Sequence, residues 1–231
     1  MKLRFGVLIV LVALAITAVP AVAVADVYHY SGRVASAYAP VFGADAVNPE
    51  LFVSVNAGDS VFKAHVPGAK VEKDAMSSAD VFVDWPMEPV DGAYVRFAWL
   101  SLAPYNAGID RKLTTAGMHA DLKGVLVEGT LTAIVGEPGA FELTDAVETP
   151  ITGRADLNWV GDGSLVFYRF RMQDRGFGYR IFDRAAGKYR PALVTGSLTI
   201  DGIELPADLD FTGEIAESKG MTIVHGMYPM Q

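Results

Sequence analysis

Residues 164–190 read SLVFYRFRMQDRGFGYRIFDRAAGKYR, and this stretch carries the clearest structural pattern in a chain of 231 residues. Aromatic and branched residues alternate with polar ones, and this period of two is typical of β-strands. Gly176 supplies the backbone freedom that a tight turn needs. The pattern predicts a hairpin of two strands joined by a two-residue turn at Arg175 and Gly176.

The same hairpin is basic and aromatic within an acidic chain. It holds seven Lys or Arg against two Asp, whereas the whole chain has a formal charge of −8. The expected register places Arg171 opposite Arg180 and Arg169 opposite Phe182. Two arginines directly across a strand pair repel each other by up to about 1 kcal/mol. Either an anionic ligand or a carboxylate of the protein must offset that repulsion, from the hairpin's own aspartates or from the acidic run 201–214.

The first of these possibilities defines a candidate binding site. The guanidinium fork fits phosphate and carboxylate groups, and aromatic rings stack on sugars. We therefore expect an anionic polysaccharide or an acidic lipid head group as the partner. The candidate ligand-binding residues are Arg169, Arg171, Arg180, Tyr168, Tyr179 and Phe182.

The N-terminus has the form of an export signal. Lys2 and Arg4 precede an uncharged apolar run at 5–19, and residues 23–25 have the small-x-small form of a cleavage site. Residues 1–25 are therefore predicted to be a signal-peptide helix, which places the mature protein outside the cytoplasm, secreted or in the cell envelope. A retained anchor helix is the alternative, because the run is just long enough to span a bilayer. No membrane span is expected after cleavage.

The rest of the chain reads as β structure. Strand-like segments separated by Gly, Pro and Asp-Gly signals recur over residues 26–231, and none has a sustained helical period. The sequence predicts an all-β, antiparallel sandwich or barrel of about twelve short strands, in one domain. A division near residues 104–117 is the alternative, because that segment has turn residues and no period. Trp85, Trp99 and Trp159 are interpreted as core residues.

Several classes of chemistry lack their motifs. The chain has no Cys, which excludes thiol nucleophiles, disulfides and thiolate metal sites. The four His residues have no metal-ligand spacing, and neither a nucleophile elbow nor a glycine-rich phosphate loop occurs. We therefore expect no metal and no cofactor. We expect no nucleic acid partner either, because the chain is acidic overall.

The leading hypothesis is an exported, non-enzymatic β protein that binds an anionic or carbohydrate component of the cell envelope through the hairpin. Residues 162–171 are similar to hairpins of large lipocalin-like barrels, and residues 125–145 resemble the first hairpin of an OB-fold. One alternative is thus a lipocalin-like barrel that carries an apolar ligand. The other alternative is a secreted hydrolase with convergent acids or a Ser–His pair. The residues that would line the barrel are Phe167, Phe170, Phe182 and Trp159. The oligomeric state is not predicted.

Overall fold

The computed structural model describes residues 25–42, 49–66, 68–135, 139–176 and 179–225. Within them it has nine strands and no helix, which confirms the all-β, antiparallel prediction. The strands are β1 (Asp26–Phe42), β2 (Pro49–His65), β3 (Glu72–Asp84), β4 (Tyr94–Leu102), β5 (Thr115–Ala133), β6 (Phe141–Gly161), β7 (Val166–Gly176), β8 (Tyr179–Ile200) and β9 (Thr212–His225).

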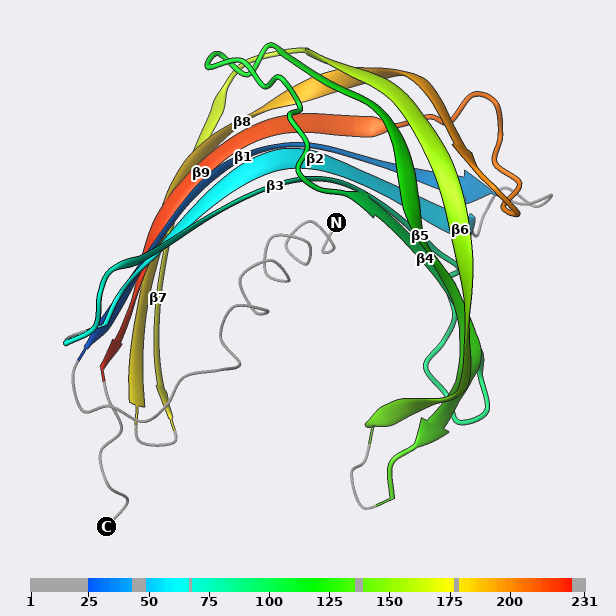
Figure 1. The fold of residues 1–231 in the computed structure, drawn as a ribbon, viewed down its shortest axis with the longest axis horizontal. Coiled ribbons are helices and arrows are strands. Elements are labelled where there is room, and N and C mark those ends of the chain that lie inside the picture. The colour runs from blue at the N-terminus through cyan, green and yellow to red at the C-terminus, as the bar shows by residue number, and fades with distance from the viewer. Residues whose placement is uncertain (1–24, 43–48, 67, 136–138, 177–178, 226–231) are drawn as a thin grey trace.

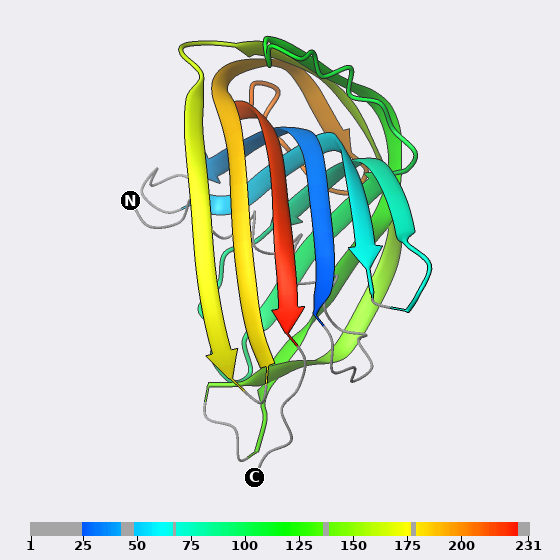
Figure 2. The same ribbon diagram turned by 90° about the vertical axis from the view of Figure 1, so that its left-hand side faces the viewer.

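The strands form a single sheet that curves in a ring rather than the two sheets of a sandwich (Figure 1). The order across the sheet is β6-β5-β4-β3-β2-β1-β9-β8-β7, and β6 also pairs with β8. This additional pairing joins residues 153–161 to residues 192–200 and closes the ring at one end. At the other end, among the residues that the structure describes, β7 pairs with β8 alone and the sheet is open there. Figure 2 shows β7, β8, β9, β1 and β2 side by side along this open limb.

β8 changes its partner strand at Pro191. Its residues 179–189 pair with β7, and its residues 192–200 pair with β6. Proline has no N–H to donate, so it fits a ladder position where one partner strand ends and another begins. The carbonyl oxygen of Pro191 accepts a hydrogen bond from the Asp162 N–H at 2.7 Å, in the loop between β6 and β7. β8 therefore pairs with β6 where the ring is closed and with β7 where the sheet is open.

The number of strands differs from the prediction of about twelve. β2, β3, β6, β8 and β9 each join two segments that the sequence suggested were separate, because Gly, Ser and Pro positions taken as breaks lie inside strands. In β2, for example, a Cβ atom at Gly58 would lie 2.3 Å from the Arg33 carbonyl oxygen. Glycine at this position allows two curved strands to approach closely instead of ending one of them.

Residues 1–25 are predicted to be a signal-peptide helix. All of them except Ala25 lie outside the described residues. Among the residues that the structure does describe, no helix has the length and apolar character that crossing a membrane requires.

The segment 104–117 packs against the core of the sheet. Ile109 is 7% exposed and Leu113 is fully buried, and both belong to the main apolar cluster. The carboxylate of Asp110 organises the loop, since it accepts hydrogen bonds from the N–H and the hydroxyl of Thr114 at 2.5 and 2.8 Å. Strands from both sides of this segment belong to the same sheet.

Trp159 is the largest fully buried side chain in the described part of the protein. It projects from β6, and its Nε1–H donates a hydrogen bond to the carbonyl oxygen of Ser36 in β1 at 3.0 Å. Gly213 of β9 leaves room for the indole, because a Cβ atom there would lie 3.2 Å from the Trp159 ring. The core interpretation is confirmed for Trp159. It is wrong for Trp99, which is 55% exposed on β4.

The unpaired strand edges in the described part of the sheet include the outer edge of β7, residues 141–151 of β6 and residues 72–78 of β3. The β6 edge contains Pro150, which cannot donate a ladder hydrogen bond, and Asp145, which has a positive φ of 52°. Acidic side chains add charge to it, and arginines do the same for β7. Proline, local irregularity and charge are features that discourage edge-to-edge association.

The indole of Trp159 gives a test of how strongly the closed end depends on this contact. Trp159→Phe removes the hydrogen bond to Ser36 and leaves part of the indole volume empty. We expect it to lower the free energy of unfolding by about 2 kcal/mol or more, measured by urea unfolding followed by circular dichroism. Trp99→Phe is the matched control and should change the same quantity by less than about 0.5 kcal/mol. Equal effects of the two substitutions would contradict the structural role of Trp159.

Candidate functional site

Side chains alternate between the two faces of the sheet, and directly paired residues of neighbouring strands share a face. Ala35 of β1, Val53 of β2 and Ile215 of β9 are fully buried. They define the face that lies against the core, which we call the core-side face. The β1–β2 register is regular up to residue 41, and the β1–β9, β8–β9 and β7–β8 registers have no irregularity. The same face can therefore be followed along all five strands of the open limb.

The apolar core on the core-side face ends at a row of ion pairs. Arg33 of β1 lies 3.3 Å from Asp59 of β2, and Lys188 of β8 lies 3.1 Å from Glu217 of β9, measured between nitrogen and oxygen. Arg33 is also directly paired with Glu217 in the β1–β9 register. Arg33 and Lys188 donate to backbone carbonyl oxygens of the segment 104–117, at 2.9 and 3.3 Å. This ion-pair row therefore holds that segment against the sheet.

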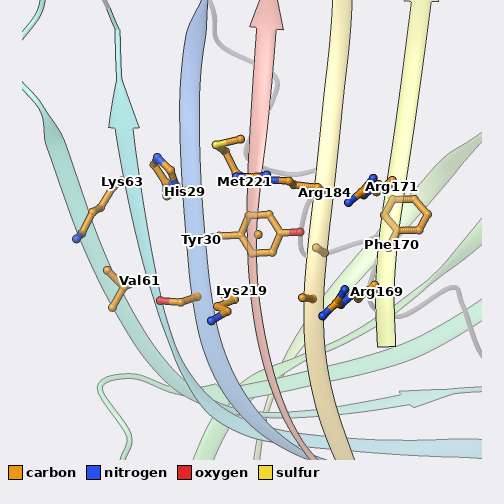
Figure 3. Close-up of a pocket in the computed structure, with 14 residues that line it drawn as sticks. His29, Tyr30, Val61, Lys63, Arg169, Phe170, Arg171, Arg184, Lys219 and Met221 are labelled. Atoms are coloured by element: carbon orange, nitrogen blue, oxygen red, sulfur yellow. The ribbon is translucent and has the colours of Figure 1, made fainter. Parts of the chain in front are cut away.

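Beyond the ion-pair row, toward the open end, lies a pocket of about 510 Å³. It extends across β2, β1, β9, β8 and β7 (Figure 3). Five cationic side chains line it: Lys63, Arg169, Arg171, Arg184 and Lys219. By the strand registers all five belong to the core-side face. We call this site the basic pocket.

The five cations lack a neutralising partner within the described residues. None of them is within ion-pair distance of a carboxylate there, although six such contacts occur elsewhere in the structure. No carboxylate is among the described residues that line the pocket. Asp183 of the hairpin lies on the opposite face, where it is buried and accepts a hydrogen bond from the Thr222 hydroxyl at 3.2 Å. The basic pocket is thus a concentration of positive charge in a chain of net charge −8.

The hairpin that supplies three of these cations has the expected strands in a different register. β7 continues to Gly176 and β8 begins at Tyr179, so Arg175 and Gly176 are strand residues and the predicted turn at these two positions is wrong. As a result Arg171 lies opposite Arg184 instead of Arg180. The turn was predicted at Gly176 because glycine favours turns, whereas the structure places Gly176 at the end of β7. The expected pairing of two arginines is present, with a different partner.

The remaining register predictions shift in the same way. Arg169 lies opposite Ala186 instead of Phe182. By alternation along β8, Phe182 and Arg180 are on the core-side face, but farther along the strand from the ion-pair row, and neither lines the basic pocket. Of the six candidate residues, the structure brings Arg169 and Arg171 into one pocket.

The two candidate tyrosines are not placed beside these arginines. Tyr168 is on the opposite face of β7, where it covers Gly187 of β8: a Cβ atom on Gly187 would lie 2.4 Å from the Tyr168 hydroxyl oxygen. Burial raises the pKa of Tyr168. Tyr30 of β1 covers Gly220 of β9 in the same manner. The side chain of Tyr179 lies outside the described residues. Tyr168 and Tyr30 therefore pack on the face opposite the core-side face, on the same group of strands that carries the cations.

Sequence reasoning missed the cations that come from distant strands. Lys63 is in β2 and Lys219 is in β9, and only the pairing of both strands with β1 brings them to the hairpin. A signal for Lys63 was present, since Lys63 lies an even number of residues from the buried Val53 and Val55, and alternation along one strand places such residues on the same face. That alternation assigns Lys63 to the core-side face once β2 is recognised as one continuous strand.

Of the four aromatic residues expected to line a barrel interior, Phe170 is among the described residues that line the basic pocket, and Phe167, Phe182 and Trp159 are not. Trp159 is fully buried in the core, whereas Phe167 is 73% exposed on β7. Phe170 and Phe182 are 43% and 37% exposed.

A second polar cluster lies on the exposed surface of β5 and β6. The Nδ1 atom of His119 is 3.0 Å from the Asp156 carboxylate, and Arg154 donates to both Asp156 and Asp121, at 2.9 and 3.0 Å. The hydrogen bonds from His119 and Arg154 lower the pKa of Asp156. The cluster is internally paired. No group of three or more His, Cys, Asp or Glu residues suited to a metal ion occurs in the described part of the chain.

Comparison with known proteins adds little to this geometry. No family model matches the sequence, and no curated protein matches it. The chain is similar to a solved structure described as an acetoacetate decarboxylase-like enzyme from Sphingomonas wittichii RW1, with 14% identity, coverage of 89% of this chain and 93% of that chain, and a TM-score of 0.23. A TM-score this low does not indicate a shared fold, so neither fold nor activity is carried over.

The facing arginines give a prediction about stability. Arg171 and Arg184 are directly paired without a carboxylate, so they repel each other in the folded state. Arg171→Gln should raise the free energy of unfolding by a few tenths up to ~1 kcal/mol. Urea unfolding at low salt measures this gain, which should shrink near ~1 M salt because screening weakens the repulsion. The control Arg154→Gln breaks two ion pairs and should give no gain; a loss of stability in Arg171→Gln would show a structural role instead.

The half-buried side chain of Tyr30 gives a prediction about stability at alkaline pH. Burial, with smaller contributions from Asp183 and Tyr168, raises the pKa of Tyr30 to about 12 from its usual 10.0. The folded state therefore holds this proton more tightly than the unfolded state does, so stability is complete below about pH 10 and falls as the pH rises toward 12. Tyr30→Phe should remove part of that decline, measured by urea unfolding across alkaline pH. An unchanged decline would show that Tyr30 does not titrate abnormally.

Proposed function

We propose that the protein is an exported, non-enzymatic β protein that binds an anionic component of the cell envelope in the basic pocket. The observation that supports this most strongly is the convergence of five cations from β2, β7, β8 and β9 without a carboxylate among the described residues. Folding brings these charges together against their mutual repulsion. The carboxylates of the ion-pair row, Asp59 and Glu217, are already paired with Arg33 and Lys188. An anionic ligand would supply the missing charge.

Arginine chemistry favours phosphate or carboxylate groups as the anion. Arg171 and Arg184 are directly paired on neighbouring strands, whose backbones are about 4.8 Å apart. Long side chains that start from neighbouring strands can reach one oxyanion together, each guanidinium contacting it through a planar fork of N–H donors. The bound anion would convert a repulsive pair into two charge-assisted contacts.

The charge distribution supports selective binding at this face. The chain is acidic overall, so its remaining surface repels anions in general, and the local positive potential directs them to the basic pocket. The extracytoplasmic location rests on the N-terminal sequence, in which Lys2 and Arg4 precede the apolar run 5–19 and the small residues at 23–25. The envelope contains both anionic polysaccharides and anionic lipids, and the two sources are separated by experiment.

The test measures binding of the chain to three probes: phosphatidylglycerol vesicles, phosphatidylcholine vesicles and a soluble carboxylated polysaccharide. We expect binding to at least one anionic probe, and binding that weakens steeply between about 0.1 M and about 1 M salt. Arg171→Gln combined with Arg184→Gln should weaken it by roughly tenfold to hundredfold, because two charge-assisted contacts are lost.

The control is a double variant that removes the same charge away from the pocket, Lys123→Gln with Arg154→Gln. It should bind as the unaltered chain does, and both double variants should keep the circular dichroism spectrum of a folded β protein. Equal weakening by both would mean that affinity follows net charge rather than the basic pocket. Binding to neither anionic probe would overturn the proposal.

A further inference from the structure

The cations of the basic pocket are not spread evenly, and their distribution deepens the proposed function on which this inference rests. One cross-strand row on the core-side face runs through Arg171, Arg184, Met221, His29 and Lys63, from β7 to β2. Its two ends are cationic, and no Lys or Arg lies between them in that row. Figure 3 shows the same separation, with Lys63 at one side of the pocket and Arg169, Arg171 and Arg184 at the other.

Each end of the row is a cluster of like charges. The first, which we call the arginine cluster, consists of Arg169, Arg171 and Arg184 on β7 and β8. The second, which we call the lysine cluster, consists of Lys63 of β2, which lines the basic pocket, and Lys73 of β3, which is directly paired with Lys63 but is not among the lining residues. Within the described residues neither cluster has an ion pair with a carboxylate. Each cluster therefore repels itself and would be stabilised by an anion of its own.

One small anion cannot serve both clusters. β7 and β2 are separated by four inter-strand steps, which amounts to about 19 Å between their backbones on a flat sheet. A phosphate group contacts donors within about 3 Å of its oxygen atoms. Even with the reach of long side chains, an anion held by the arginine cluster leaves the lysine cluster unpaired.

The floor between the clusters suits a neutral connecting group. Met221, Val61 and Ala186 supply apolar surface, and Ser31 supplies a hydroxyl. Lys219 of β9 lies in the adjacent row and adds one charge near the middle. The nearest carboxylates on this face, Asp59 and Glu217, are already paired in the ion-pair row.

We infer that the ligand carries two phosphate-like groups joined by a neutral spacer, one held by the arginine cluster and the other by the lysine cluster. The arginine cluster is the stronger of the two, because guanidinium forks contact a phosphate through two N–H groups whereas each lysine acts as a point charge. A pocket of about 510 Å³ is within the range of sites that hold a compact small molecule.

The test uses two series of soluble probes, alkyl monophosphonates and α,ω-alkane bisphosphonates, with spacers from propane to dodecane. Isothermal titration calorimetry measures the dissociation constant of each probe with the full chain. We expect a spacer length at which the bisphosphonate binds at least tenfold more tightly than the monophosphonate of equal chain length, because the second group binds at a high effective concentration. Shorter bisphosphonates should show no such gain.

Two single variants assign the two ends. Arg171→Gln should weaken both series, whereas Lys63→Gln should weaken only the bisphosphonate of optimal length, reducing it to the affinity of the monophosphonate. Lys123→Gln, on the exposed surface of β5, is the control and should change neither series. Lys63 and Lys123 are both exposed, so each substitution leaves the core intact.

The outcomes separate this inference from the proposed function. Equal affinity of the two series at every length, or an unchanged affinity in Lys63→Gln, would overturn the two-anion ligand while leaving a single anion site at the arginine cluster. If neither series binds and the anionic vesicles and polysaccharide also fail, the proposed function itself is wrong.

Discussion

The pairing of β6 with β8 is the contact on which the architecture depends. It requires the two backbones to approach closely, and glycines permit this: a Cβ atom on Gly196 would lie 1.8 Å from the Asp156 carbonyl oxygen, at a φ of 126°. With this pairing the sheet closes and gains an enclosed side that can be filled by apolar residues. Without it the nine strands would form an open sheet whose core-side face was exposed along its whole length.

Closure at one end alone also determines where unpaired charge can reside. The closed end buries Trp159, Leu100 and Leu157 completely, and an unpaired cation there would carry a large desolvation cost. The ion-pair row marks the border, with side chains that are between 27% and 47% exposed. Past it the strands continue into the open limb, where water solvates Lys and Arg side chains without a partner. The basic pocket exists because these strands extend beyond the region that the ring encloses.

The sequence predicted the fold class and part of the site, and its errors have physical causes. Alternation identified β7 and β8 and put Arg169 and Arg171 on one face. The predicted number of strands was too high because glycine and proline were taken as strand ends. In this strongly curved sheet they lie inside strands, where Gly58 allows two strands to approach closely and Pro191 marks a change of partner strand. Local pattern could not bring Lys63 or Lys219 to the site, since their proximity to the hairpin depends on pairings across the whole chain.

The position of β1 has a consequence for how the chain folds. β1 pairs with β2 on one side and with β9 on the other, and Asp26 lies opposite Val224. β1 therefore keeps an open edge until residues 212–225 have been synthesised. Contacts at so large a sequence separation are slow to form, because a long loop must close before they stabilise anything. The ring therefore cannot be completed until residues 212–225 have been synthesised, whereas the pairings from β1 to β6 need no residue after Gly161.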